Sequence, residues 1–232
     1  MKKSIVFVAL GVALALGQMA TAQISINAGY LSSSIRQRVT YAANQIDTTM
    51  TLAGGFYGGL SYNIKTNLPI GIEVGLYASY GSNNENRTIK QGPMETTVKS
   101  SITMLDLAVP LHISYKYDFT DDFSLVASVG PTLQVGLSGS QTASMKMTAM
   151  GMEMSSSEIS GDLFSQLEGE SGPYFTRFDI GLSLLAGVQF HGFRVQLGYI
   201  LGTLDRCGYA DGGNYSFDFH MGQLSAGIGY SF

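Results

Sequence analysis

Charged residues are scarce in this chain, and cysteine is almost absent. Asp, Glu, Lys and Arg make up 13% of the 232 residues, and Cys207 is the one cysteine. A single cysteine excludes an internal disulfide framework. Residues 23–232 contain no run that approaches 18 apolar residues, which excludes a membrane-spanning helix there. Basic clusters are also missing, so the sequence predicts no nucleic-acid partner.

The first 22 residues, MKKSIVFVALGVALALGQMATA, have the layout of a secretory signal. Lys2 and Lys3 precede an apolar stretch over 5–16, and small residues stand at Ala20 and Ala22. The alternative, a membrane anchor, is disfavoured because this stretch is short for a spanning helix. We predict cleavage after Ala22, which leaves residues 23–232 as one domain with 11 basic and 17 acidic residues.

What the sequence has in abundance is apolar residues at every second position. In GQLSAGIGYSF (222–232), Phe232, Tyr230, Ile228, Ala226 and Leu224 share one face, opposite small or polar residues. This period of two is typical of a β-strand with one apolar side. The same alternation recurs over 24–31, 54–65, 70–80, 103–118, 123–137, 177–190 and 193–201. These eight segments are long enough to cross a bilayer as tilted strands.

The connections between these segments alternate in length. Short turns are predicted at 66–69, 119–122 and 191–192, and long loops at 32–53, 81–102, 138–176 and 202–219. Short turns at one end and long loops at the other are typical of outer-membrane barrels. We predict an all-β fold, an eight-stranded antiparallel transmembrane β-barrel with up-and-down topology. Within the third loop, Ile159, Leu163, Phe164 and Leu167 predict a short helix over 157–169.

The stretches VPLHISYKYDF, FSLVASVGPTL, RFDIGLSLLAGVQF and VQLGYILG resemble the small outer-membrane β-barrel domain family, which includes PorT-like and OmpA-like eight-stranded barrels. The resemblance implies the cell outer membrane of a Gram-negative bacterium. It also implies insertion by the barrel-assembly machinery. The positions that match the family's C-terminal insertion signal are Ile228, Tyr230 and Phe232.

The polar positions of the strands predict what fills the barrel. An eight-stranded barrel is only wide enough for its own side chains. We therefore expect an interior polar network that closes the lumen, formed by Glu73, Asp106, His112, Lys116, Asp179 and Arg194. The alternative is a narrow channel or a transporter of small solutes, hydrophobic ones included, with a lateral opening. A gap in strand pairing at Pro110 or Pro131 would favour this alternative, because proline cannot donate to the ladder.

Two arrangements could indicate an enzyme. His112 and Ser114 form an H-x-S pair, and Asp218 and His220 stand near the predicted rim. The first pair is out of phase with the lipid-facing set, and neither pair shows the partners that catalysis needs. We predict a protein that is not an enzyme and has no cofactor.

The long loops are rich in Ser, Thr, Asn, Gly and Met, and binding is often carried by loops on a rigid scaffold. We therefore expect a structural or surface-interaction role, with outer-membrane lipid and an extracellular or membrane-protein partner. In MKMTAMGMEM, thioethers could bind Cu(I), or the loop could simply pack on the barrel mouth. We predict no metal site, and the candidate ligands would be Met145, Met147, Met150, Met152 and Met154.

Overall fold

The computed structural model describes residues 22–41, 44–65, 69–92, 94–150, 152–165, 174–208 and 215–232. Residues 1–21 of the predicted signal lie outside this set. Within it, no helix is long and apolar enough to cross a membrane. The strands are β1 (Ala22–Tyr41), β2 (Asn44–Lys65), β3 (Ile70–Gln91), β4 (Met94–Asp118), β5 (Phe123–Ala149), β6 (Met152–Asp162), β7 (Phe178–Phe190), β8 (Phe193–Gly202) and β9 (Tyr215–Ser231).

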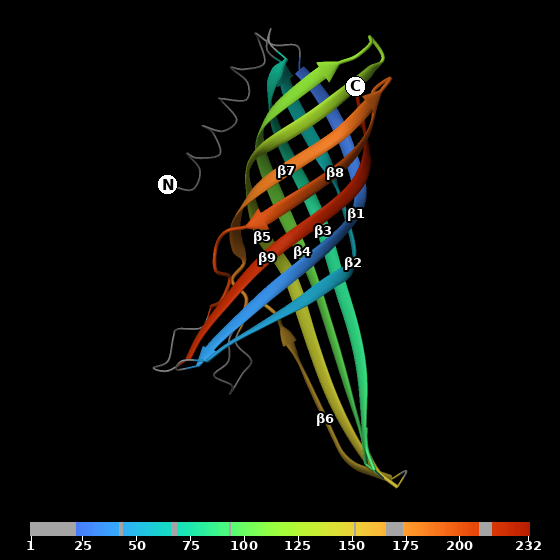
Figure 1. Cartoon of the computed structure of the whole chain (residues 1–232), viewed down its shortest axis with the longest axis vertical. Helices are drawn as coiled ribbons and strands as arrows, with labels where there is room; N and C mark the ends of the chain where they lie inside the picture. Colours follow the sequence, from blue (N-terminus) through green and yellow to red (C-terminus); the bar gives the residue numbers. More distant parts are fainter. Residues whose placement is uncertain are drawn as a thin grey trace.

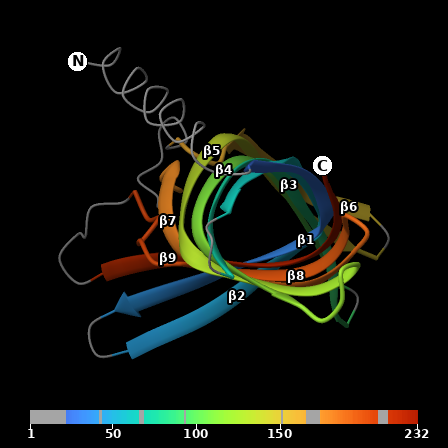
Figure 2. The ribbon, with the colours of Figure 1, turned by 90° about the horizontal axis from the view of Figure 1, so that it is seen from above.

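Eight of these strands close into a ring, in the order β1-β2-β3-β4-β5-β7-β8-β9 (Figures 1 and 2). Every pairing is antiparallel, and β9 returns to β1 with Tyr230 opposite Ile26. Closure removes the unpaired edge that lipid would not tolerate. The predicted eight-stranded antiparallel barrel is confirmed. The ninth strand, β6, pairs with β5 beyond the ring.

The apolar positions that the alternation identified point outward. Ile113 and Ile228, for example, are 62% and 66% exposed. At the end with short turns, aromatic side chains contact one another: the rings of Phe193 and Tyr230 lie 4.9 Å apart, and those of Tyr230 and Phe232 lie 5.0 Å apart. Such aromatic girdles mark the membrane interface of outer-membrane barrels.

Three of the four predicted long loops are wrong over most of their length, because strands continue through 32–53, 81–102 and 138–176. The fourth, 202–219, lies mostly between strands, since β8 ends at Gly202 and β9 begins at Tyr215. β4 begins at Met94 and β5 ends at Ala149 (Figure 1). Along β4 the polarity of the two faces reverses near residue 104. On the side of the short turns the outward residues are apolar, such as Leu105 and Leu107. On the side of the flap tip they are polar, such as Thr97 and Lys99. The outward face meets lipid in the first part and water in the second.

Beyond this boundary, away from the short turns, the wall separates into two sheets. One consists of 81–91 of β3, 94–103 of β4, 138–149 of β5 and all of β6, and it forms the long projection at the lower end of Figure 1. We call this four-stranded sheet the flap. The other sheet consists of the hairpin of β1 and β2 together with the start of β9.

The segment after β6 enters the mouth of the barrel, and the predicted helix over 157–169 is not present in its described part. β5 pairs with β6 down to Ser140 and with β7 from Val135, so that only 136–139 separate the two ladders. Leu163 and Phe164, which lie between β6 and β7 in sequence, turn inward and are buried. Gly136 and Gly139 give them room, since a Cβ at Gly139 would lie 2.9 Å from the Phe164 ring.

Both strand prolines coincide with gaps in the backbone ladder. The pairing of β3 with β4 skips from Val74–Leu111 to Tyr77–Ala108, beside Pro110. The pairing of β4 with β5 skips from Pro110–Thr132 to Ile113–Val129, beside Pro131. Backbone or side-chain atoms fill the space, because a Cβ at Gly75 would lie 3.0 Å from Pro110 Cγ. The wall is thus less hydrogen-bonded at mid-height without being open there.

Candidate functional site

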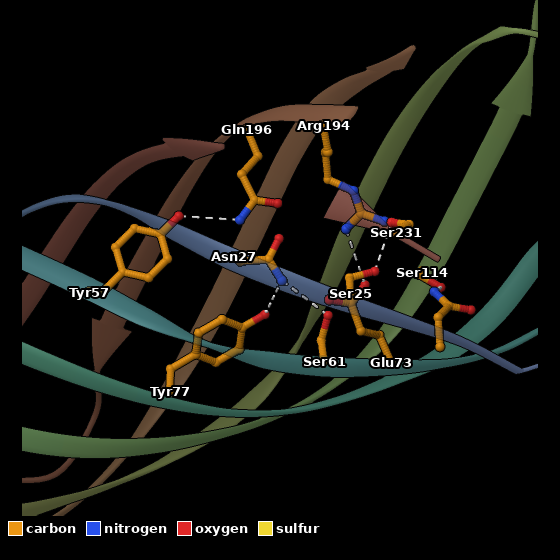
Figure 3. Close-up of polar contacts among 11 residues, drawn as sticks. Ser25, Asn27, Tyr57, Ser61, Glu73, Tyr77, Ser114, Arg194, Gln196 and Ser231 are labelled. Carbon is orange, nitrogen blue, oxygen red and sulfur yellow. Dashed lines mark hydrogen bonds and ion pairs between the residues drawn. The ribbon is translucent and has the colours of Figure 1, made fainter. Parts of the chain in front are cut away.

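The lumen is the first candidate site, and an ion pair crosses it near the short-turn end (Figure 3). Glu73 of β3 and Arg194 of β8 are both buried, and Glu73 Oε2 lies 3.6 Å from Arg194 Nη1. Neither of these two atoms has a hydrogen-bond partner within the described residues. Two opposite charges held together in a low dielectric are strongly coupled, because removal of either leaves the other buried alone.

Neutral hydrogen bonds continue the network next to this pair (Figure 3). Asn27 donates through Nδ2 to Ser61 Oγ at 3.3 Å and to Tyr77 Oη at 3.0 Å. Gln196 donates through Nε2 to Tyr57 Oη at 3.2 Å. These side chains come from β1, β2, β3 and β8, so the contacts tie opposite walls of the barrel together.

His112 and Ser114 are buried in the lumen but do not contact each other as a pair. The His112 imidazole is hydrogen-bonded through Nε2 to the hydroxyl of Ser183 on β7. Ser114 Oγ accepts a hydrogen bond from Asn63 Nδ2 at 2.9 Å. No carboxylate in the described residues is hydrogen-bonded to the His112 ring, and His112 Nδ1 has no partner there. The geometry therefore lacks the oriented base that nucleophilic catalysis needs.

The other predicted site residues lie in different surroundings. Lys116 is at the short-turn end, half-buried, and pairs with Asp118 at 2.9 Å. Asp218 and His220 stand opposite Arg38 and Arg36 in the ladder of β1 with β9.

Arg206 is a buried charge that the alternation could not reveal. It lies between β8 and β9, it is fully buried, and its guanidinium donates to Thr176 O at 3.0 and 3.1 Å. Its Nη1 contacts Met221 Sδ at 3.4 Å. Asp106 and Asp179, two of the predicted interior residues, are also buried, and Asp179 Oδ1 accepts a hydrogen bond from Leu204 N at 3.2 Å. Arg206 and Asp179 thereby anchor the segment after β8 inside the mouth.

Between these polar groups and the mouth, the lumen is closed by apolar side chains. The rings of Phe175 and Phe219 stack at 4.7 Å, and Phe164 lies under the guanidinium of Arg177 at 4.6 Å. We call the whole cluster of buried apolar residues the plug. Its members are Ile35, Leu52, Met104, Leu163, Phe164, Phe175, Phe219 and Met221. Ile102 and Cys207 are partly buried and pack against it. The sequence predicts a polar lumen and does not predict the plug. An apolar residue that points inward cannot be recognised from the alternation when its neighbours in the outward phase are apolar too.

Separate cavities lie along the lumen. One of about 370 Å³ at the short-turn end is lined by Lys116 and Arg194, and one of about 90 Å³ at mid-height is lined by Glu73 and His112. A third, of about 280 Å³, lies at the mouth beside Phe175. The ion pair of Glu73 with Arg194 lies between the first two, since each partner lines one of them. The plug lies between the second and the third.

Two further sets of predicted residues lie outside the lumen. The five candidate methionine ligands lie at the tip of the flap, on β5, β6 and their turn. No group of three or more His, Cys, Asp or Glu side chains is placed to hold a metal ion in the described part of the chain. Ile228, Tyr230 and Phe232 point outward from the last strand, and Phe232 N donates to Ile24 O at 2.9 Å.

A closed antiparallel ring with a lipid-facing apolar belt defines an outer-membrane β-barrel. The family model described as "Outer membrane protein beta-barrel domain" matches residues 6–232, and the chain belongs to this family. Membership places the protein in the outer membrane of a Gram-negative bacterium. No curated protein sequence matches the chain. The narrower likeness to PorT-like proteins stays a prediction.

Several solved structures match most of the chain at low identity and low TM-score. They include Ail, the attachment invasion locus protein of Yersinia pestis, with 17% identity and a TM-score of 0.27 over 91% of this chain and 99% of that one. Neisserial surface protein A has 13% identity and a TM-score of 0.34, with coverages of 91% and 99%. OprG from Pseudomonas aeruginosa has 11% identity and a TM-score of 0.34, with coverages of 92% and 97%.

Proposed function

We propose that this chain is a closed-lumen barrel that serves as a structural or surface-interaction protein, not as an enzyme. The observation that carries the proposal is the plug. Its aromatic and aliphatic side chains close the lumen just inside the mouth, and the ion pair of Glu73 with Arg194 crosses the lumen nearer the short-turn end. A dry apolar layer is a barrier to ions and polar solutes, because no group in it replaces their hydration.

The part that remains available for binding is the flap and the neighbouring sheet. By the rule that short turns face the periplasm, both sheets project from the outer surface of the cell. The flap carries ion pairs on its outer face, Lys90 with Glu95 at 3.3 Å and Lys146 with Glu153 at 2.6 Å. A partner there would be an extracellular ligand or another membrane protein. The remaining proposed partners are outer-membrane lipid and, through Ile228, Tyr230 and Phe232, the barrel-assembly machinery.

The test is the conductance of residues 23–232, refolded and inserted in a planar bilayer. We expect no steady current from the natural sequence. Removing the plug by Phe164→Ala, Phe175→Ala and Phe219→Ala should raise the frequency of current steps. The matched control, Phe190→Ala on the lipid-facing side, should stay silent. Discrete steps from the natural protein that change with Arg194→Gln or Glu73→Gln would overturn the closed-lumen proposal.

A second candidate is a carrier of small hydrophobic solutes that enter through the wall. The observation in its favour is that the mid-height cavity, lined by Pro110 and Thr132, lies beside the two gaps in the ladder. Binding of a small apolar fluorescent probe to the refolded protein would support this role if Ala108→Phe, which fills the cavity, abolished it. Unchanged binding would place the probe on the lipid-facing surface and remove this candidate.

A further inference from the structure

Methionines gather on one face of the flap tip. The register places Met94 of β4 and Met152 of β6 opposite Ala149, one on each side of β5. Directly paired residues share a face, so both lie on the same side as Ala149. Met147 and Met145 follow at the next alternate positions of β5, again on this face. Four thioethers from three adjacent strands are therefore on one surface, the inner face of the flap.

Methionine is concentrated at the flap tip, although Met104 and Met221 also serve as apolar residues in the plug. Six of its eleven methionines belong to this tip. The lipid-facing belt, by contrast, is built from Ile, Leu, Val, Phe and Tyr, and methionine is absent from its described residues. If the tip needed only an apolar inner face, the same aliphatic residues would serve, as Ile89 and Val98 do at neighbouring positions of that face.

The geometry points to a binding site for a soft monovalent cation, Cu(I) or its analogue Ag(I), held by the thioethers of Met94, Met147 and Met152. Met94 and Met152 lie on either side of β5, about 10 Å apart across two strand spacings, and Met147 is two residues along β5 from the Ala149 between them. Flexible methionine side chains can converge over these distances. Ala149, at the centre of the three, has only a methyl group and leaves space above it. Met145 lies on the next rung and is placed to act as a fourth ligand.

The surroundings favour a soft ion over a hard one. Asp and Glu oxygens are the ligands of Ca²⁺ and Mg²⁺, whereas thioether sulfur prefers Cu(I). Of the nearest charges, Glu95 and Glu153 lie on the opposite face, where they pair with Lys90 and Lys146. Thr96 and Ser155, the residues paired with Met147, are neutral. Binding would be a reversible donation of sulfur lone pairs, without oxidation or reduction of the ion.

The experiment uses refolded residues 23–232 in detergent micelles and Ag(I), which stays monovalent in air. The methionine methyl groups are labelled with ¹³C, and their NMR signals are followed as Ag(I) is added. We expect the signals of Met94, Met147 and Met152 to move together and to saturate at one ion per chain. The signal of Met50, on the inner face of the other sheet, should not move.

A matched pair of variants separates ligation from general apolar binding. Met94→Leu, Met147→Leu and Met152→Leu together keep the face apolar, and they should weaken Ag(I) binding by about 100-fold or more, since even changes around the ligands cost 10–100-fold. The control, Met50→Leu, should bind as the natural protein does. Heat-modifiable migration on gels confirms that each variant is folded. Ag(I) binding unchanged in the triple variant, or no saturable binding at all, would overturn the proposal and leave the face as an apolar docking surface.

Discussion

Packing of Phe164 against two glycines offers a sharp test of the plug. Phe164 is almost fully buried, and its ring occupies the space in which a side chain at Gly136 would stand. A Cβ at Gly136 would overlap the ring, with Phe164 Cε2 at 3.1 Å and two further ring atoms closer. Gly136→Ala should therefore lower the free energy of unfolding by about 1–3 kcal/mol through overpacking.

The opposite change removes the ring. Phe164→Ala leaves a cavity among Leu163, Phe175 and the other plug residues. It should lower the free energy of unfolding by about 3–5 kcal/mol. It also removes the contact of Arg177 with the ring face, for which about 0.5–1 kcal/mol is typical of an exposed site. In the double variant the alanine at 136 has nothing to overlap, so it should cost no more than Phe164→Ala alone. The coupling energy in the double-mutant cycle should be about 1–3 kcal/mol.

The assay is urea unfolding followed by far-ultraviolet circular dichroism, since the chain has no tryptophan. Gly58→Ala is the matched control, because the nearest atom to a Cβ there is Asn27 O at 3.8 Å. It should be neutral or slightly stabilising, as expected where alanine replaces glycine in a strand without strain. Additive effects of Gly136→Ala and Phe164→Ala would refute the proposed packing of the plug.

Three further outcomes are expected. Arg194→Met should lower the free energy of unfolding by about 3–5 kcal/mol, because it leaves the Glu73 carboxylate buried without its partner. The double variant Arg194→Met with Glu73→Leu should lower it much less, and equal losses in the single and double variants would contradict strong coupling of the ion pair. Hydrogen bonds from Arg36, from Arg38 and from Gln45 hold the pKa of Asp47 below its ordinary value of 3.8. Its stabilising contribution is thus present above that value and lost as the pH falls through the lowered pKa. An NMR titration of the Asp47 carboxyl should show this, with Arg36→Gln moving the midpoint upward. Phe232→Ala should slow assembly into native outer membranes while leaving refolding in detergent intact, and equal effects on both would remove its role as an insertion signal.

The lipid-spanning part of the fold was predictable because one physical constraint acts on it throughout. Lipid demands an apolar outward face, and a strand turns every second residue outward, so the alternation in segments such as 103–118 identifies each strand and its phase. The same reasoning placed Glu73, Asp106, His112, Asp179 and Arg194 inside the ring, where the structure finds them buried. The short turns also followed, with His191 and Gly192 both at positive φ, as a two-residue hairpin turn requires.

The strands above the membrane were missed because the constraint on them reverses. In β5 the outward residues change from Leu133 and Val135 to Ser140 and Thr142, and the apolar residues move to the inward phase. The few apolar residues in this phase stand among Ser, Thr and Met, so the alternation is weak and the pattern predicts loops instead of strands. Reading the inverted phase would have extended β4, where the period of two continues across the boundary. In β5 a bulge between Gly136 and Ser138 also shifts the phase by one residue, which hides the continuation further.

By itself, the sequence determined the ring, its lipid-facing belt and the polar identity of the lower lumen, because these depend on local periodicity. Only the tertiary structure decided the plug, the position of Arg206 and the gathering of methionines. Phe164, Phe175 and Phe219 join Leu52 and Met104 in one cluster, although 60 or more residues of chain separate the two groups. Met94 joins Met147 and Met152 only through the register of β4, β5 and β6. Contacts of this kind depend on strand register and on where a segment folds back into the barrel, and neither is written in the local alternation of residues.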